Sequence, residues 1–262
     1  MLAALIAVSS SSIFADTKTD AVDPRFAQVE EMVKASNFKG AYDTLNQMAN
    51  QGNAQAIYNL GYLTQTGQGT PKNEKKAIEL YEQAAKKGYP VANYVLGKNY
   101  AGGTLGLKQD LTKAKQYLER ASNSGFDDAT VDYAVLLFAE GTATGDQQAL
   151  KKLQPLIQKG NFQAIHAKAL YDISQGFKKK DEKPIQQGIN AIQDLAKKGY
   201  IPALMAVGNM LANGNIVPQN LPEAKKIFSA LAKENIPQAK ESLAAVDKMI
   251  TEQAKKPAAK KS

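Results

Sequence analysis

The sequence offers few side chains of the types that perform acid–base or metal chemistry. Its 262 residues include one histidine, His166, and no cysteine, which excludes thiolate metal sites, disulfides and cysteine nucleophiles. A catalytic His166 would need an acid or a nucleophile beside it, and nothing in the spacing predicts one. We therefore expect a packed or rim histidine in a protein that is not an enzyme and that holds no cofactor and no metal.

The densest acidic group in the chain is Asp127, Asp128 and Asp132, of which the last two share a helical face. Calcium prefers more oxygen ligands than these three, placed on a loop with a glycine turn. The dipole of a helix favours negative charge at its N-terminus. We therefore interpret Asp127 and Asp128 as residues of the first turn of a helix.

A regular spacing of helix-ending residues is the strongest signal in the sequence. Glycine, or in one case asparagine, recurs at intervals of 36, 37, 35, 39 and 36 residues. Both residue types tolerate the left-handed backbone conformation in which a helix stops and the chain turns. The six terminators are Gly52, Gly88, Gly125, Gly160, Gly199 and Asn235. Such a period predicts a helical repeat protein.

The residues before each terminator predict the second helix of every repeat. A small residue stands eleven positions before the terminator, and a large apolar residue stands seven positions before it. These offsets fall on one helical face, which predicts a buried stripe. The small residues are Ala41, Ala77, Ala114, Ala149, Gly188 and Ala224, and the large ones are Leu45, Tyr81, Leu118, Leu153, Ile192 and Phe228.

The residues after each terminator predict the first helix of the next repeat. The fourth residue after each terminator is always alanine, and the ninth is glycine or alanine. Small residues at these two positions allow close packing against neighbouring helices. The eighth position is usually bulky, but Lys168 breaks this column, so repeat five is the least regular. Glycine-rich loops, which lack the GK[ST] motif of phosphate-binding loops, end in capping residues for the second helix, namely Asn73, Asp110 and Asn220.

Helix pairs of this length bury their apolar stripes only by stacking on one another. We therefore expect an all-α solenoid of about six helix-turn-helix repeats over residues 24–253. The N-terminal pair, at about 24–35 and 39–50, and a C-terminal capping helix, at about 238–253, would shield its two ends.

The stretch 54–88 resembles a Sel-one-like repeat. The matching residues are Ala56, Leu60, Gly61, Gly67, Gly69, Lys76, Ala77, Tyr81, Ala84, Ala85 and Gly88. Repeats three and six resemble the pattern well, whereas repeats four and five keep the helix pattern without the loop signature. The resemblance covers about 54–243. It implies a tetratricopeptide-like right-handed superhelix that serves as a scaffold for protein-protein interaction.

In the resembled family the first helices usually line the concave face, which implies a groove for a partner protein. The candidate residues stand three, six, seven or ten positions after a terminator, and many are apolar where a surface helix would carry charge. The alternative is that they pack against a neighbouring repeat. The partner-binding candidates are Tyr58, Tyr62, Val91, Tyr94, Val95, Lys98, Asp132, Val135, His166, Leu170, Met205 and Asn209.

The N-terminal segment resembles the end of a secretory signal. An apolar run at 2–8 is followed by four serines and by Ile13, Phe14 and Ala15. We therefore expect a signal peptide at 1–15 that lacks its positive region, then a linker at 16–23, and a periplasmic location in a Gram-negative bacterium. The alternative is a short apolar helix. The run is too short to span a membrane.

The formal net charge of +8 overstates how basic the folded part is. Four lysines lie in the segment 254–262, and the rest of the chain carries 29 basic against 25 acidic residues. We expect this segment to be a disordered, solvated tail, with at most weak electrostatic contact to anionic envelope polymers. The distribution of charge does not favour nucleic-acid binding.

These observations favour a non-catalytic adaptor of the bacterial cell envelope that binds a partner protein on its concave face. One alternative, implied by periplasmic Sel-one-like proteins, is an immunity protein that neutralises a secreted antibacterial toxin such as a lipase. A second is a β-lactam-binding or hydrolysing enzyme, as reported for cysteine-rich members of the family. A third is a structural protein attached to the wall or membrane through the lysine tail.

Overall fold

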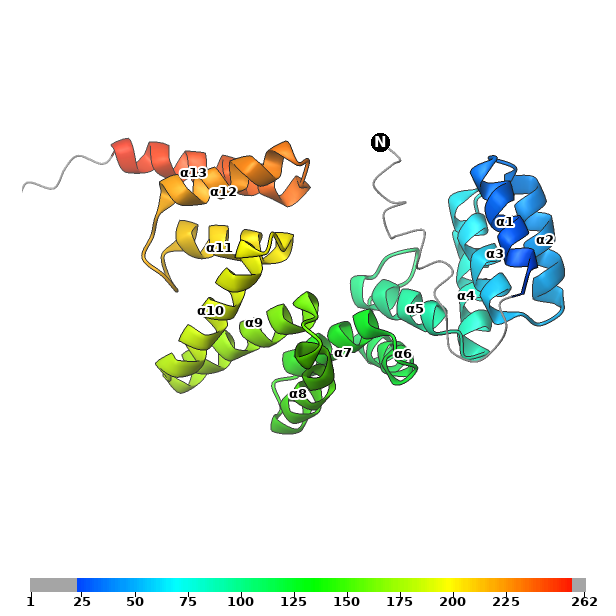
Figure 1. Cartoon of the computed structure of the whole chain (residues 1–262), viewed down its shortest axis with the longest axis horizontal. Coiled ribbons are helices and arrows are strands. Elements are labelled where there is room, and N and C mark those ends of the chain that lie inside the picture. Colours follow the sequence, from blue (N-terminus) through cyan, green and yellow to red (C-terminus); the bar gives the residue numbers. More distant parts are fainter. Residues whose placement is uncertain (1–22, 256–262) are drawn as a thin grey trace, which may run out of the picture. The chain divides into compact units, whose positions relative to one another are not determined.

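The computed structural model describes residues 23–255, and this part of the chain is all-helical (Figure 1). It contains thirteen α-helices and no β-strand between residues 23 and 255. The predicted all-α class is therefore confirmed. The expected signal peptide at 1–15, most of the expected linker and residues 256–262 of the expected tail lie outside the described residues.

The helices form six consecutive pairs and one closing helix. The first helices of the pairs are α1 (Arg25–Lys34), α3 (Ala54–Thr66), α5 (Pro90–Gly102), α7 (Asp127–Ala139), α9 (Phe162–Lys179) and α11 (Ile201–Asn213). The second helices are α2 (Phe38–Asn50), α4 (Glu74–Lys86), α6 (Leu111–Asn123), α8 (Ala143–Gln158), α10 (Glu182–Lys197) and α12 (Leu221–Lys233). The closing helix is α13 (Pro237–Lys255).

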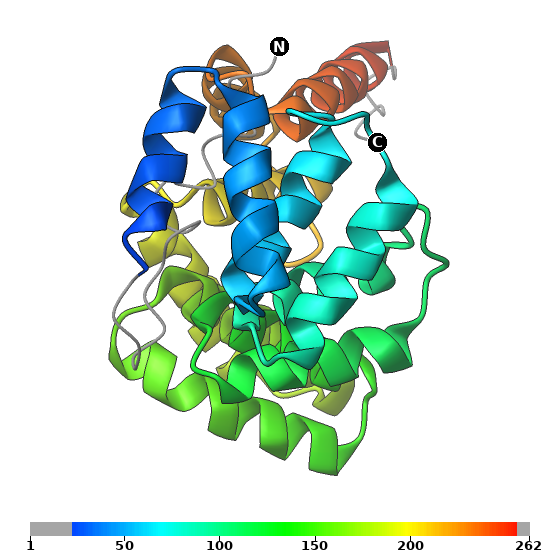
Figure 2. The ribbon, with the colours of Figure 1, turned by 90° about the vertical axis from the view of Figure 1, so that its right-hand side faces the viewer.

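The chain divides into two compact units, the N-terminal unit (residues 1–126) and the C-terminal unit (residues 127–262). In the N-terminal unit, α1 to α6 follow one another in sequence order (Figure 2). The hairpins α3–α4 and α5–α6 are the most extensively packed there. In the C-terminal unit the hairpin α9–α10 has the most extensive packing. Each unit therefore buries its apolar stripes by stacking successive helix pairs.

The predicted helix ends are confirmed. All five terminator glycines and Asn235 have a positive φ, from +58° at Asn235 to +88° at Gly52. The side-chain oxygens of Asn73, Asp110 and Asn220 accept hydrogen bonds from the backbone of the following helix, as expected of N-caps. Asp127 and Asp128 lie in the first turn of α7, as predicted.

The predicted buried stripe of the second helices is also confirmed. Its large residues are at most 1% exposed in all six repeats, and they include Tyr81, Phe228 and Ile192. The first helix meets this stripe with glycine in repeats two, three and six. A Cβ atom at Gly97 would lie 2.7 Å from Leu118 Cγ, and one at Gly208 would lie 2.7 Å from the ring of Phe228. These glycines therefore let the two helices of a repeat approach closely.

Repeat five differs from repeats two, three and six in the length of its helices. Its α9 has 18 residues and its α10 has 16, whereas α11 and α12 of repeat six have 13 each. Only Lys180 and Asp181 connect α9 to α10, in place of the seven-residue loop 214–220 of repeat six. Repeat five thus gains eight helical residues and loses five loop residues, which accounts for the 39-residue spacing between Gly160 and Gly199.

Repeat five also exchanges the small residues at its helix–helix contact. Its first helix carries Ala169 where repeats two, three and six carry glycine, and its second helix carries Gly188 where they carry alanine. A Cβ atom at Gly188 would lie 2.5 Å from the carbonyl oxygen of Ala169. Lys168, which breaks the apolar column, forms an ion pair with Asp172 one turn later on α9. The irregular sequence therefore retains close packing.

The closing helix α13 covers the last repeat. Val246 on α13 is buried in a cluster with Phe228 and Leu221 of α12, and Leu243 and Met249 pack against this cluster. At its C-terminal end, Gln253 Nε2 donates a hydrogen bond to Gln219 Oε1 at 2.8 Å. Between residues 23 and 255, no helix has both the length and the hydrophobicity needed to cross a membrane.

Candidate protein-binding surface

The first helices of the N-terminal unit place one predicted residue in the core and leave the others near the surface. Tyr58 is only 9% exposed, and its ring lies 5.3 Å from each of the rings of Tyr81 and Tyr89. Burial raises the pKa of Tyr58 to about 12. Tyr58 therefore packs between helices, which is the alternative that the sequence left open for these columns.

The remaining candidates of the N-terminal unit are accessible in part. Tyr62, Val91 and Val95 are half-buried. The ring of Tyr94, also half-buried, packs against that of Phe126 with centroids 5.0 Å apart. Lys98 is exposed, and its amino group lies 5.9 Å from the centre of the Tyr94 ring. None of these five side chains lines either of the two pockets described below.

In the C-terminal unit, the residue of each first helix that stands six positions after a terminator packs against neighbouring side chains. The ring of His166 lies edge-on to that of Tyr200 at 5.7 Å, and burial lowers the pKa of His166. Met205 packs against the apolar cluster that contains Phe228. His166 is thus a half-buried, packed histidine, as the sequence predicted.

Apolar side chains at the tenth position of the first helices are exposed in the C-terminal unit. Val135 on α7 is 46% exposed and Leu170 on α9 is 47% exposed. Asp132, one turn before Val135, is half-buried. Val135 and Leu170 are thus exposed at the same position of two successive first helices, where the sequence predicted a partner-binding stripe.

The structure brings two of the predicted residues together. Leu170 of α9 and Asn209 of α11 line a pocket of about 260 Å³, which is also lined by Ala206, seven positions after the terminator Gly199. Ile173, Ile192 and Met210 supply further apolar walls, and amide side chains of the α11 end and the following loop complete the lining, namely Asn213 and Asn215. The predicted stripe therefore becomes a cavity where α9 faces α11.

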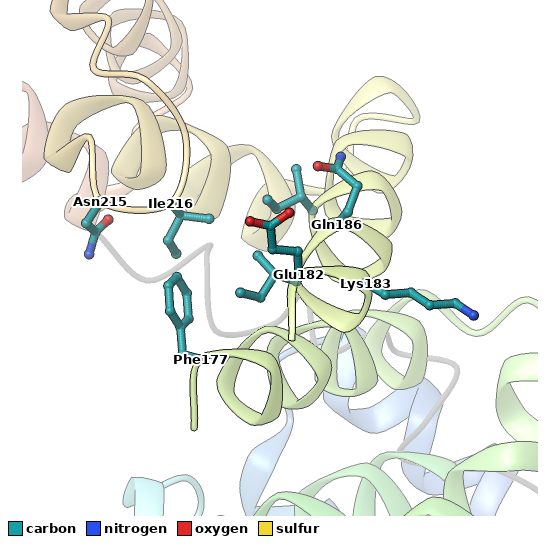
Figure 3. Close-up of a pocket in the computed structure, with 8 residues that line it drawn as sticks. Phe177, Glu182, Lys183, Gln186, Asn215 and Ile216 are labelled. Atoms are coloured by element: carbon teal, nitrogen blue, oxygen red, sulfur yellow. The ribbon is translucent and has the colours of Figure 1, made fainter. Parts of the chain in front are cut away.

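A second pocket, of about 460 Å³, adjoins the first (Figure 3). The two pockets share Asn215 and Ile216, which lie on the loop between α11 and α12. The ring of Phe177 points toward Ile216, whereas the side chain of Lys183 extends away from the pocket (Figure 3). The other lining residues are Glu182, Ile185, Gln186 and Ile189. We call the two pockets together the Ile216 groove.

Much of the second pocket comes from the lengthened helices of repeat five. Phe177 lies in the additional C-terminal residues of α9, and Glu182 and Lys183 lie in the additional N-terminal residues of α10. Gly176 allows these extensions to meet, because a Cβ atom there would collide with Ile185 and with the carbonyl oxygen of Asp181. A repeat with 13-residue helices has no counterpart of this wall.

Polar contacts fix the helix α9 and the loop on either side of the groove. The hydroxyl of Tyr171, next to Leu170, donates a hydrogen bond to Asp146 at 3.0 Å, and burial together with this contact raises the pKa of Tyr171 to about 12. Across the groove, Gln219 Nε2 donates to the carbonyl oxygen of Ala212 at 2.9 Å, and Gln253 binds Gln219 from α13. The groove is therefore built on anchored elements.

Sequence reasoning missed the residues that complete the groove, which are Phe177, Ile185, Asn215 and Ile216. Two signals were available. The 39-residue spacing indicated that repeat five has a different length, and Ile216 is an apolar residue within a glycine- and asparagine-rich loop. Neither signal shows that the two features face each other, because that depends on the packing of α9 and α10 against α11.

A family model for the Sel1 repeat matches residues 54–89, 90–126 and 201–235. These segments correspond to repeats two, three and six, which have 13-residue helices and long loops between them. The resemblance drawn from the loop and helix residues of these three repeats is thereby confirmed. Repeats four and five lie between the matched segments.

Solved structures share the fold. A Sel1 repeat protein from Oxalobacter formigenes is 22% identical with a TM-score of 0.64, over 84% of this chain and 86% of that one. A protective antigen of uropathogenic Escherichia coli strains, which displays an SLR fold, is 21% identical with a TM-score of 0.60, over 80% of this chain and 44% of that one. At these identities the likeness shows the fold alone.

Curated relatives match over shorter segments. Protein SHC1 of Saccharomyces cerevisiae is 27% identical over 132 residues, which is 41% of this chain and 26% of that protein. Chitin synthase regulatory factor 3 of Schizosaccharomyces pombe is 29% identical over 84 residues, which is 32% of this chain and 9% of that protein. The chain thus spans about a quarter or less of these relatives. With its repeat geometry, the chain is a helical repeat protein of the solenoid type, and three of its segments match the Sel1 repeat.

Proposed function

We propose that this protein is a non-catalytic adaptor of the bacterial cell envelope that binds a partner protein through its first helices. Sel1 repeat proteins are generally protein-interaction scaffolds. The observation that carries the proposal is the exposure of aliphatic side chains at the tenth position of successive first helices, Val135 and Leu170. Leu170 also lines a pocket, so a partner side chain has a cavity to fill there.

Crosslinking from envelope extract tests the binding surface. We compare the unmodified protein with the double variant Val135→Asp, Leu170→Asp, in which a charge opposes burial of each position. The matched control is Leu111→Asp, because Leu111 is a 54% exposed leucine at the start of a second helix. We expect the double variant to lose its crosslinked partner and the control to retain it. Equal capture by both variants would reject the first-helix surface.

The envelope location is tested separately from binding. The sequence predicts cleavage after Ala15, so the mature protein recovered from the envelope fraction should begin near Asp16. N-terminal sequencing of that protein gives the answer directly. Recovery of an intact Met1 from the cytosolic fraction would contradict the envelope part of the proposal and leave the binding surface unaffected.

A further inference from the structure

We propose that the Ile216 groove binds an extended peptide segment of a partner protein in which apolar side chains are followed by acidic ones. This inference rests on the proposed function and names the site and the partner chemistry. Three observations carry it: the apolar walls of the two pockets, the unused amide groups of their lining, and the lysines that follow Phe177 in the chain.

The two pockets of the groove suit apolar side chains. Ile173, Ile192 and Met210 wall one pocket, and Phe177 and Ile185 wall the other. Phe177 is 50% exposed, so a ligand side chain packed against its ring would remove a large apolar surface from water. The pockets adjoin at Ile216, so side chains from one face of an extended segment, which are about 7 Å apart, can enter both.

Amide side chains at the rim favour an extended partner over a helical one. Asn209, Asn213 and Asn215 make no side-chain hydrogen bond within the described part of the chain. An amide both donates and accepts, as a peptide group does. A helix satisfies its backbone groups internally, whereas an extended segment presents N–H and C=O groups that need partners. The carboxylate of Glu182 in the second pocket adds an acceptor for a backbone N–H.

The charges beside the second pocket indicate the chemistry of the partner's next residues. Four lysines follow Phe177 within six positions, namely Lys178, Lys179, Lys180 and Lys183. None of these four forms an ion pair inside the region 23–255, whereas Lys168 on the same helix pairs with Asp172. Asp181 and Glu182 offset them in part, so the segment 178–183 carries a formal net charge of +2, from four lysines and two carboxylates.

These lysines lie where a partner's acidic side chains would contact them outside the pocket, apart from the apolar contacts inside it. The carboxylate of Asp181 already accepts a hydrogen bond from the backbone of Lys183 at 3.0 Å, where it caps α10. The amino group of Lys183 points away from the pocket (Figure 3). Acidic side chains of a partner would therefore meet the lysines outside the pocket, after its apolar side chains have entered it.

Selection from a library of displayed random peptides on the intact protein tests the inference. Peptides of about ten residues are long enough to cross both pockets at about 3.3 Å per residue. We expect the enriched peptides to carry two apolar positions followed by Asp or Glu. A labelled enriched peptide should bind Phe177→Ser about tenfold more weakly than the unmodified protein, and Lys179→Glu with Lys183→Glu should shift the preference to basic peptides.

Two further variants complete the test, one as a control and one as a second change within the groove. Phe162→Ser changes an exposed aromatic residue at the opposite end of α9 and should leave the affinity unchanged. Ile216→Ser should abolish binding, and because Ile216 packs against the core, its unfolding is compared with that of the unmodified protein. Phe177→Ser keeps the test valid if Ile216→Ser does not fold, because the Phe177 ring is half exposed.

The outcomes separate the inference from the proposed function. Enrichment of basic or amphipathic helical peptides, or binding that Phe177→Ser does not weaken, would overturn the inference. So would a selection that yields no groove-dependent peptide. If crosslinking to an envelope partner persists in Phe177→Ser but is lost with Val135→Asp alone, a change outside the groove, the proposed function stands and the groove is not its site.

Discussion

Repeat six and repeat five use the same kind of helix hairpin in different ways. Repeat six has 13-residue helices joined by a seven-residue loop, whereas repeat five has helices of 18 and 16 residues joined by two residues. Both bury a large apolar residue at the same position of the second helix, Phe228 and Ile192, with no exposed surface. The two repeats thus share the same buried core, whereas the lengths of their helices and of the connecting loop differ.

The difference shows where a repeat protein acquires individual features. A regular repeat has the same backbone outline as the other regular repeats, because the lengths of its helices and loop are the same. In repeat five the additional residues leave Phe177 half exposed beside the loop of repeat six. The loop that repeat six keeps and the helices that repeat five extends therefore form the groove together.

The first prediction separates the shared core from the extension. Ile192→Ala and Phe228→Ala should each lower the free energy of unfolding by about 2–5 kcal/mol, because each leaves a cavity in a fully buried stripe. Phe177→Ala should lower it by about 0.5 kcal/mol or less, because the ring is half exposed. Urea unfolding followed by circular dichroism measures all three. A loss at Phe177 as large as that at Ile192 would show that the extension is part of the core.

The second prediction concerns the exchanged small residues. Gly97→Ala and Gly188→Ala should each cost about 1–3 kcal/mol, because the new methyl group overlaps atoms of the opposite helix. Shortening Leu118 to alanine should relieve the clash at residue 97, so that this double variant costs less than the two single changes summed. No second side-chain change can relieve the clash of an alanine at residue 188, because its methyl group would meet the backbone carbonyl oxygen of Ala169.

Gly102→Ala is the control for the glycine variants. Gly102 also lies in a first helix, but its nearest neighbour, Thr104 Cγ2, is 3.4 Å from the position of an added Cβ. The substitution should change the free energy of unfolding by about 0.5 kcal/mol or less. A comparable cost at residues 97 and 102 would mean that glycine is needed for something other than close helix packing.

The sequence predicted the parts of the fold that are locally encoded. A terminator such as Gly88, a cap such as Asn220 and a stripe residue such as Phe228 each act within one helix or at its end. Their spacing alone is sufficient to place the hairpins. The same reasoning identified α7 and α9 correctly in the two repeats that lack the loop signature, because the helix pattern there is intact.

The parts that sequence did not predict depend on contacts between helices. Tyr58 and Tyr62 stand one turn apart on α3, yet Tyr58 is enclosed by the rings of Tyr81 and Tyr89 while Tyr62 is only half-buried. Which column faces a neighbour is set by the rotation of the helix, and an uncertainty of one residue changes it by about 100°. The groove likewise depends on how α10 packs against α11.

The third prediction compares the two ways of starting a second helix. Asn220 ends a long loop and accepts a hydrogen bond from the backbone of Glu223 at 3.1 Å, and Asp181 ends a two-residue turn and accepts one from Lys183 at 3.0 Å. Replacing either by alanine should cost about 1 kcal/mol, and Asn220→Asp, which retains the acceptor, should cost less. Thermal unfolding provides the measurement. A negligible effect of Asp181→Ala would show that the short turn needs no cap.

The fourth and smallest effect is a pH dependence carried by His166, at the regular end of α9. Its ring packs edge-on to Tyr200, and burial lowers its pKa below the ordinary value of 6.5 because the charged form loses hydration. Below pH 6.5 the unfolded chain therefore takes up a proton that the folded chain resists, and stability falls until the folded pKa is passed.

His166→Phe should remove this part of the pH dependence and leave stability above pH 7 nearly unchanged, since the neutral imidazole there is already accommodated against Tyr200. The titration is directly observable by NMR, because the chain contains one histidine and its ring signals need no assignment among several. A midpoint at or above pH 6.5 would mean that the ring is hydrated and that this end of α9 is as open to solvent as the extension that carries Phe177.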